Sequence, residues 1–281
     1  DLMDIRTEKI IKHYTISVNP YANKNDIIVY LYKLQNNDLL VATALGVYQY
    51  NSQKDIFEQL SQFPNNCRIQ TLFEDHDGVI WAGTSNKGLY YYNPTTSQHG
   101  EFKLDTVNTS RTINNIYEDR KNNLWFATGD GIKIYDRSTQ QTTKYDMQDG
   151  LPSNVIYRIE EDKKGNMWIS TANGLARLNP KNHKIKVFKK EHGLTSNQFN
   201  YNSSLKTDND KLYFGTLKGM ISFQPNSIQE FSIQPKVYIS QINYNDPDHN
   251  FLHQEAITFK KGITLEHNQS TFYIDYTSLS Y

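Results

Sequence analysis

An internal repeat constrains the fold of this chain more than any other feature of its 281 residues. Five four-residue segments begin with a large hydrophobic residue, have a small residue third and end in threonine: Leu40–Thr43, Trp81–Thr84, Trp125–Thr128, Trp168–Thr171 and Tyr213–Thr216. Their threonines lie 41, 44, 43 and 45 residues apart, and a glycine follows each of them by three or four residues. A period of 40–45 residues is typical of β-propeller blades.

Each repeat can be divided into short strands separated by turn residues. In the fourth repeat the expected strands are residues 155–161, 167–171, 175–178 and 184–189. Asn, Asp, Gly and Pro stand at the breaks, as hairpin turns require. No segment shows the 3.6-residue apolar period over the ~10 residues that a helix needs, which argues against helical repeats. The sequence therefore predicts an all-β fold, a propeller of four-stranded blades with five repeats present.

The repeated columns have a structural interpretation. The tryptophans are expected to fill the space between neighbouring blades, and the small residues after them to permit close sheet packing. Three acidic pairs are expected to end the first strands and to cap turns: Glu74-Asp75, Glu118-Asp119 and Glu161-Asp162. The segment Asp75-x-Asp77-Gly78 has part of a calcium-loop pattern, but the other ligand positions of an EF-hand are missing, so a hairpin turn is the better interpretation.

The chain divides into three parts. Residues 1–26 are interpreted as the fourth strand of a preceding or closing blade with its link, residues 27–230 as five blades, and residues 231–281 as a different β module. A complete five-bladed ring and a part of a larger ring both fit this arrangement. A seven-bladed ring needs about 300 residues at this period, more than precede residue 231. In the last part, strands are expected at 234–242, 263–265 and 271–276, around a polar, turn-rich stretch at 243–254.

Composition excludes several classes of function. The 30 basic and 30 acidic side chains give a formal net charge of zero, which argues against a nucleic-acid-binding protein. No apolar stretch reaches the ~18 residues of a membrane span. The single cysteine, Cys67, excludes an intrachain disulfide and a cysteine-rich metal site. No catalytic or phosphate-binding motif occurs, so the sequence predicts no catalytic residue, no metal and no cofactor.

Several motifs resemble those of one known family. The two-component regulator propeller repeat is similar to Glu74–Thr84 and Glu161–Leu175, and the links that this family uses between blades are similar to Asp149–Asn154 and His192–Asn197. The segment Pro235–Ile242 resembles the start of the triple-tyrosine Ig-like module that follows such propellers. The resemblance covers residues 27–281.

This resemblance implies the periplasmic sensor of a hybrid two-component system histidine kinase. In such receptors two seven-bladed propellers and the Ig-like module precede a membrane helix and the kinase. Members commonly sense oligosaccharides released from complex glycans and act as homodimers. The chain would then be the end of the second propeller with the start of the Ig-like module, connected to the membrane only through an absent downstream segment. Reception or relay of the signal is expected of it, and not the output.

If a ligand binds this chain, blade geometry predicts where. The links between blades and the turns between second and third strands emerge together at one end of a propeller. Nine polar side chains at this end or within first strands are candidate ligand contacts: Asn86, Lys87, Arg111, Asp130, Asn154, Arg158, Asn173, Asn197 and Lys218. Amides and guanidinium groups suit sugar hydroxyls and uronate carboxylates. The competing interpretation is that these are solvated turn residues.

Three hypotheses of function remain open. The first is a non-enzymatic sensor fragment that detects an oligosaccharide or relays its detection. The second is a propeller lyase or glycosidase, which needs a convergent His/Glu or carboxylate pair at the channel. The third is a structural or dimerisation module in which residues 231–281 make the contact.

Overall fold

The computed structural model describes residues 1–14, 16, 27–104, 110–228, 237–246, 251–256, 262, 264, 267 and 271–278. The chain forms two compact units, Asp1–Ser227 and Ile228–Tyr281, and each is treated by itself. Throughout the described part, the regular structure consists of strands and three short 3-10 helices, η1 (Met147–Asp149), η2 (Lys190–His192) and η3 (Pro225–Ser227). The predicted all-β fold class is confirmed.

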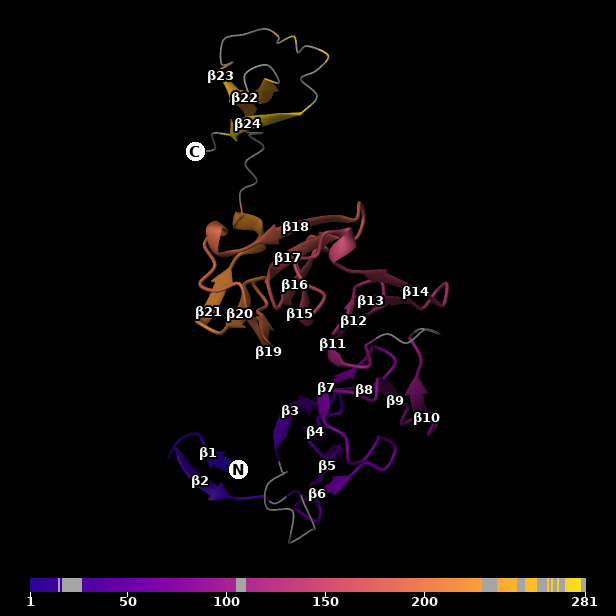
Figure 1. Ribbon diagram of the computed structural model, residues 1–281. Coiled ribbons are helices and arrows are strands. Elements are labelled where there is room, and N and C mark those ends of the chain that lie inside the picture. Colours follow the sequence, from indigo (N-terminus) through magenta and orange to yellow (C-terminus); the bar gives the residue numbers. More distant parts are fainter. Residues whose placement is uncertain are drawn as a thin grey trace. The chain divides into compact units, whose positions relative to one another are not determined.

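The first unit contains five blades of antiparallel strands (Figure 1). Blade 1 comprises β3 (Ile28–Lys33), β4 (Leu39–Thr43), β5 (Val47–Asn51) and β6 (Ile56–Gln59). Blade 2 comprises β7 (Ile69–Glu74), β8 (Ile80–Thr84), β9 (Leu89–Tyr92) and β10 (His99–Phe102). Blade 3 comprises β11 (Ile113–Glu118), β12 (Leu124–Thr128), β13 (Gly131–Asp136) and β14 (Gln141–Tyr145). Blade 4 comprises β15 (Ile156–Glu161), β16 (Met167–Thr171), β17 (Gly174–Asn179) and β18 (Lys184–Phe188). Blade 5 comprises β19 (Phe199–Lys206), β20 (Leu212–Thr216) and β21 (Gly219–Phe223).

The blades are arranged as a propeller requires. Figure 1 shows the first strand of each sheet on the inside of the unit and the last strand on the outside. The four strands of the fourth repeat begin and end within one residue of the predicted limits. Local turn chemistry was therefore sufficient to divide the repeat correctly.

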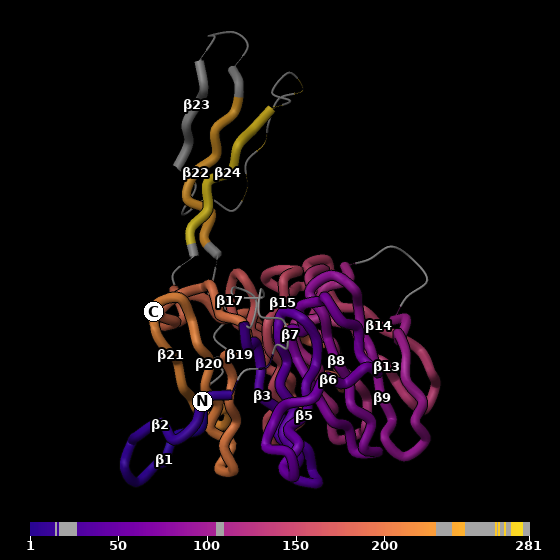
Figure 2. Tube along the Cα trace, turned by 90° about the horizontal axis from the view of Figure 1, so that it is seen from below, coloured from indigo at the N-terminus to yellow at the C-terminus, as the bar shows by residue number. Residues whose placement is uncertain are grey.

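The two ends of the propeller differ from its middle. In the described part of blade 5 the sheet has three strands, and β21 is its edge. The N-terminal strands β1 (Leu2–Asp4) and β2 (Lys9–Lys12) pair with each other in a separate hairpin, at the indigo end of the tube in Figure 2. The chain after this hairpin packs on blade 1, where the Tyr14 hydroxyl donates to Oδ1 of Asp55 at 2.7 Å.

The tryptophan column lies between blades, as predicted. Trp168 is fully buried. Its ring stacks on Phe188 of its own blade at 5.4 Å and contacts Phe223 of blade 5 at 4.7 Å. Trp81 makes the corresponding contact with Phe126 of the next blade, at 6.4 Å. Large flat side chains in this position pack consecutive sheets together, and the buried residues form a separate hydrophobic cluster at each interface from blade 1 to blade 4.

The small-residue column is equally constrained. A Cβ atom added to Gly83 would lie 2.7 Å from Cγ2 of Ile113 in the next blade and 2.8 Å from Cγ2 of Thr71. Native packing density leaves no room for such an atom. Gly83 therefore sets how closely the sheets of blades 2 and 3 approach.

The glycine column gives a direct test. Gly131 has φ of +119°, and a Cβ there would lie 2.4 Å from the carbonyl oxygen of Tyr145, whereas Gly219 has φ of +100° and open space around it. We expect Gly219→Ala to cost about 1–2 kcal/mol through backbone strain alone. Gly131→Ala should cost about 1–3 kcal/mol more, because the backbone must shift. Urea denaturation of both variants measures the difference, and equal costs would contradict the packing argument.

The second unit contains one antiparallel sheet in the order β23-β22-β24. Its strands are β22 (Val237–Asp246), β23 (Phe251–Ala256) and β24 (Phe272–Ser278). The prediction of a turn-rich stretch at 243–254 is wrong for its described residues, because β22 extends to Asp246 and β23 begins at Phe251. Residues 247–250 lie outside the described part of the chain. Cross-strand pairing of Tyr244 with His253 overrides the weak strand propensity of this polar segment. Most of the strand expected at 263–265 lies outside the described residues.

Candidate functional site

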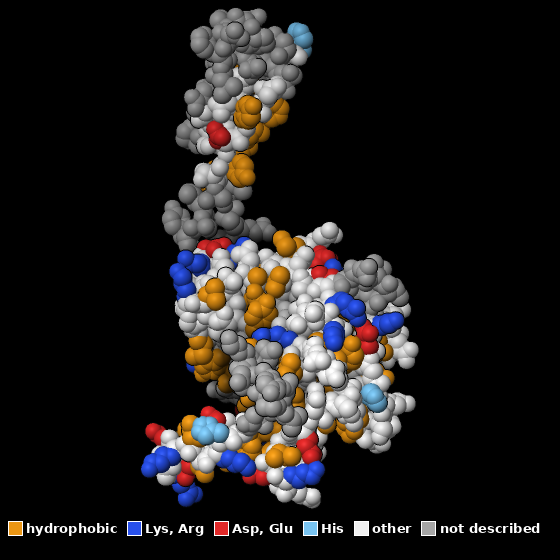
Figure 3. Space-filling model, turned by 60° about the horizontal axis from the view of Figure 1, so that its bottom comes forward, with side chains coloured by type: hydrophobic (Ala, Val, Ile, Leu, Met, Phe, Trp, Pro, Cys, Tyr) orange, Lys and Arg blue, Asp and Glu red, His pale blue; other side chains and the backbone are white. Residues whose placement is uncertain are grey.

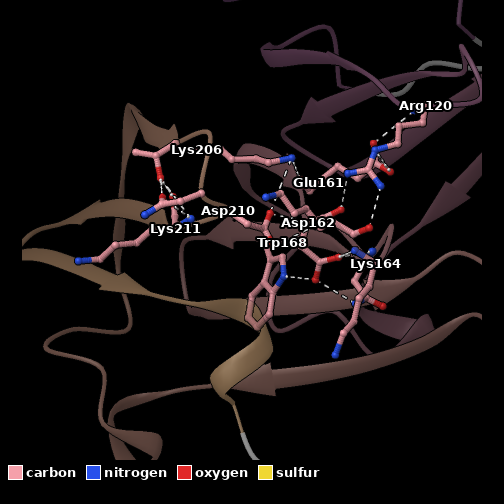
Figure 4. A network of polar contacts seen from close by, with 12 residues as sticks. Arg120, Glu161, Asp162, Lys164, Trp168, Lys206, Asp210 and Lys211 are labelled. Carbon is pink, nitrogen blue, oxygen red and sulfur yellow. Dashed lines mark hydrogen bonds and ion pairs between the residues drawn. The ribbon is translucent and has the colours of Figure 1, made fainter.

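The aspartate of each acidic pair organises the first turn of its own blade. Oδ1 of Asp162 accepts the backbone N–H groups of Lys164 and Asn166, each at 2.9 Å. Oδ2 of Asp162 accepts the Asn166 amide and the indole Nε1 of Trp168, again at 2.9 Å (Figure 4). The turn-capping role was predicted, but the bond to tryptophan was not. The constant spacing of six residues between aspartate and tryptophan in three repeats was the signal for it.

The same arrangement explains the segment with the partial calcium-loop pattern. Oδ1 of Asp75 accepts the N–H groups of Asp77 and Val79, and its Oδ2 accepts Nε1 of Trp81 at 2.7 Å. Both carboxylate oxygens of Asp75 therefore have protein donors. A hairpin turn is what these contacts build.

The glutamate of each pair reaches the preceding blade. Glu74 accepts the N–H of Gln35 at 2.7 Å, and Glu118 accepts the N–H of His76 at 2.9 Å. Glu161 accepts the N–H of Arg120 at 3.3 Å. In blade 5, Asp210 accepts the N–H of Lys163 at 3.1 Å. The acidic pair thus closes a turn with its aspartate and connects two blades with its glutamate, a division of roles that the sequence did not show.

The contact between Glu161 and Arg120 makes the stability of the protein depend on pH. Burial raises the pKa of the Glu161 carboxyl, while the Arg120 guanidinium and N–H act in the opposite direction. A raised folded-state pKa contributes stability below the unfolded-state pKa, and that contribution is lost as pH rises through the folded-state value.

We therefore expect the free energy of unfolding of the wild type, minus that of Glu161→Gln, to fall as pH rises from about 4 to 8. Gln keeps an oxygen that can accept the Arg120 N–H. Urea denaturation across this range provides the measurement, with the exposed Glu191→Gln as a control of smaller slope. A difference that grows with pH would contradict the assignment.

Two of the predicted ligand contacts hold the links between blades. Oδ1 of Asn154 accepts the N–H of Met147 at 2.9 Å, and Oδ1 of Asn197 accepts the N–H of Lys190 at 2.7 Å. Their carbonyl oxygens accept the N–H groups of the two turn glycines at 2.7 Å. These asparagines position the start of η1 and η2, and their amide nitrogens have no hydrogen-bond acceptor among the residues that the structure describes.

Three other candidates come together at the same end, in blade 2 and the link that follows it. Arg111 donates to Oε1 of Glu101 at 2.6 Å and to the carbonyl of Lys87 at 3.4 Å. Asn86, in the same turn as Lys87, is exposed. Further round this end, Asn173 and Lys218 occupy exposed turn positions of blades 4 and 5.

The remaining two candidates have strong protein partners. Oδ1 of Asp130 accepts the Thr128 hydroxyl at 2.7 Å. Arg158 lies on β15, on the inside of the propeller, where its Nε donates to Ser204 of β19 at 2.8 Å. Its Nη1 is buried and has no hydrogen-bond partner among the described residues. The structure therefore places eight candidates at the link end and Arg158 among the inner strands, and a ligand role for all nine stays a prediction.

The structure also contains two cavities that the sequence did not predict. One, of about 400 Å³, lies between blades 3 and 4 and is lined by the turns after the first and third strands. In antiparallel blades these turns lie at the end opposite to the links. The other, of about 450 Å³, lies on blade 1 and is lined by residues 49–53 and 58–62.

Comparison with known proteins agrees with this architecture. The extracellular domain of hybrid two-component system BT3049 from B. thetaiotaomicron superposes with a TM-score of 0.71 and 26% identity, over 89% of this chain and 35% of that domain. The corresponding domain of BT4673 from the same organism shares the fold, with a TM-score of 0.62 and 19% identity over 85% of this chain and 37% of that one. Histidine kinase P4 of Formosa agariphila is 29% identical over 219 residues, which are 76% of this chain and 13% of that protein.

The fold and these likenesses place the chain in the class of extracytoplasmic β-propeller sensor domains of hybrid two-component systems. The chain spans about an eighth of the curated relative that it matches. It belongs to the family described as a domain of unknown function, DUF5074, which matches residues 12–246. In the described part of the chain, no helix has the length and hydrophobicity to cross a membrane.

Proposed function

We propose that the chain forms part of the periplasmic sensor of a hybrid histidine kinase and receives, or relays detection of, an oligosaccharide. The observation that carries the sensor assignment is the 26% identical likeness to an extracellular receptor domain over 89% of the chain. The oligosaccharide is supported by the polar side chains at the link end. Arg111, Lys87 and Asn173 offer guanidinium, ammonium and amide donors there, the groups that suit sugar hydroxyls and carboxylates.

Exposed hydrophobic side chains support a larger ring. Leu205, Leu217 and Met220 of blade 5 are about 60% exposed, as is Leu31 of blade 1. Figure 3 shows hydrophobic side chains gathered in patches at one face of the molecule. Inner blades bury such residues against their neighbours. Our proposal is that further blades of the receptor, seven in total, cover them, and that the second unit is the start of an Ig-like module in a homodimeric receptor.

The histidine positions favour a sensor over a lyase or glycosidase. The inner strands β3, β7, β11, β15 and β19 contain no histidine. His76 and His183 lie in turns, where His76 pairs with Glu118 and His183 with Tyr145. The inner strands therefore supply no histidine for a His/Glu pair at the channel.

Calorimetric titration tests this function. Neutral and uronate-containing oligosaccharides are titrated into the chain and into the longer receptor that contains it. We expect at least one class to bind, and Arg111→Ala, at an exposed link-end position, to weaken binding about tenfold, or 1.4 kcal/mol. A receptor that binds none of the oligosaccharides would overturn the sugar part of the proposal. Light scattering with and without residues 231–281 tests the homodimer contact separately.

A further inference from the structure

We propose that the cavity between blades 3 and 4 is a binding site for an acidic ligand, which it recognises through a sulfate or carboxylate group. The cavity has a volume of about 400 Å³, within the size range of small-molecule sites, and opens to solvent. It lies at the end opposite to the links, so it is separate from the oligosaccharide contacts proposed above and does not depend on them.

The cavity exists because a side chain present at the previous blade interface is absent here. Between blades 2 and 3, Arg137 fills this space and pairs with Asp75, with Asp77 at 3.0 Å and with Glu118 at 3.3 Å. One repeat later, Pro180 stands at the position of Arg137. A proline ring cannot reach across to the neighbouring turn, and the space stays open.

The charge of the cavity wall between blades 3 and 4 is also opposite to that of the interface between blades 2 and 3. Lys121 stands two residues after Asp119, where the preceding repeat has Asp77 two residues after Asp75. The interface that binds its own arginine is therefore acidic, whereas the open one has a basic rim. This reversal favours an anion over a cation as the occupant.

The carboxylates in the wall already have protein donors. Asp119 accepts from the Asn123 amide at 3.1 Å and from Nε1 of Trp125 at 2.9 Å. Hydrogen bonds from Ser138 and Thr139 lower the pKa of Asp136. Glu161 accepts the N–H of Arg120 at 3.3 Å. Asp119 and Asp136 are bonded within their own turns, and Glu161 is bonded to the preceding blade. The lining carries four bases, Arg120, Lys121, Lys164 and Lys181, against these three acids, so basic groups are in excess.

Three of the four bases have no protein partner among the described residues. The ammonium groups of Lys121, Lys164 and Lys181 are exposed and have no ion pair or hydrogen bond with any residue that the structure describes. The Arg120 guanidinium is anchored on the carbonyls of Asp162 and Lys163, at 2.8 and 2.9 Å (Figure 4). Ammonium groups on the rim of one cavity recognise an anionic group by charge rather than by a planar fork, so sulfate and carboxylate are both suitable.

Titration of inorganic sulfate, glucuronate and glucose tests the site. Wild-type chain should bind sulfate, glucuronate or both, with glucose silent in this assay, and the two anion arms identify the preferred group. Lys121→Asp, which restores the acidic residue of the previous repeat, should weaken anion binding about tenfold. The double variant Lys121→Asp with Pro180→Arg should abolish binding, because it refills the cavity. Lys103→Asp, the same charge change at an exposed position on blade 2, should stay within about twofold.

Thermal melting followed by circular dichroism checks that each variant folds. If the double variant does not fold, the exposed single variants Lys164→Gln and Lys181→Gln test the site instead, and each is expected to weaken anion binding. The inference is overturned if the wild type binds neither anion, if Lys121→Asp binds as the wild type does, or if Lys103→Asp weakens binding equally. The two proposals can fail separately. If Lys121→Asp loses anion binding but still binds the oligosaccharide, the two sites are distinct.

Discussion

Trp168→Ala is expected to lower the free energy of unfolding by about 3–5 kcal/mol, the usual cost of removing a large buried aromatic side chain. Trp168 is fully buried and lies against Phe188 of its own blade and Phe223 of the next. Alanine would leave a cavity between two sheets that cannot close without shifting a blade. Chemical denaturation followed by circular dichroism measures the change.

Trp168→Phe is the matched control, because it keeps an aromatic ring between the two blades but loses the bond to Asp162 and part of the ring volume. We expect it to cost about 1–2 kcal/mol. A cost for alanine no larger than that for phenylalanine would show that the ring does not join the two blades.

Asp162→Ala is expected to cost about 3 kcal/mol, because one carboxylate accepts four hydrogen bonds. The largest part arises at Trp168, whose Nε1 would stay buried without an acceptor. Asp208→Ala, at an exposed position without such contacts in the described structure, should change stability by no more than about 0.5 kcal/mol. The same denaturation experiment compares the two variants.

A double-mutant cycle separates the shared bond from the rest. If the carboxylate and the indole act together, Asp162→Ala combined with Trp168→Phe should cost less than the sum of the single changes, because both remove the same hydrogen bond. Strict additivity would contradict that coupling.

An alignment of the repeats predicts only part of the candidate site. Comparing Arg137 with Pro180 and Asp77 with Lys121 in the printed sequence shows that one blade interface differs from the next. It does not show that Arg137 pairs with Asp75, 62 residues away. Of the link-end candidates, Asn154 and Asn197 hold the links through their side-chain oxygens, which a single repeat does not show. The partner of such a side chain lies on the neighbouring blade, so a single repeat does not reveal it.

The sequence by itself determined the all-β class, the blade period and the strands of the fourth repeat, because turn chemistry and strand alternation act over a few residues. It also determined the tryptophan column between blades, since Trp81, Trp125 and Trp168 recur at the same position of three repeats. Only the tertiary structure decided that the acidic pair joins blades through its glutamate, and that an open, basic cavity lies at the end opposite to the links. Both features depend on contacts between residues about 40 or more positions apart, whose geometry is set by how the sheets pack.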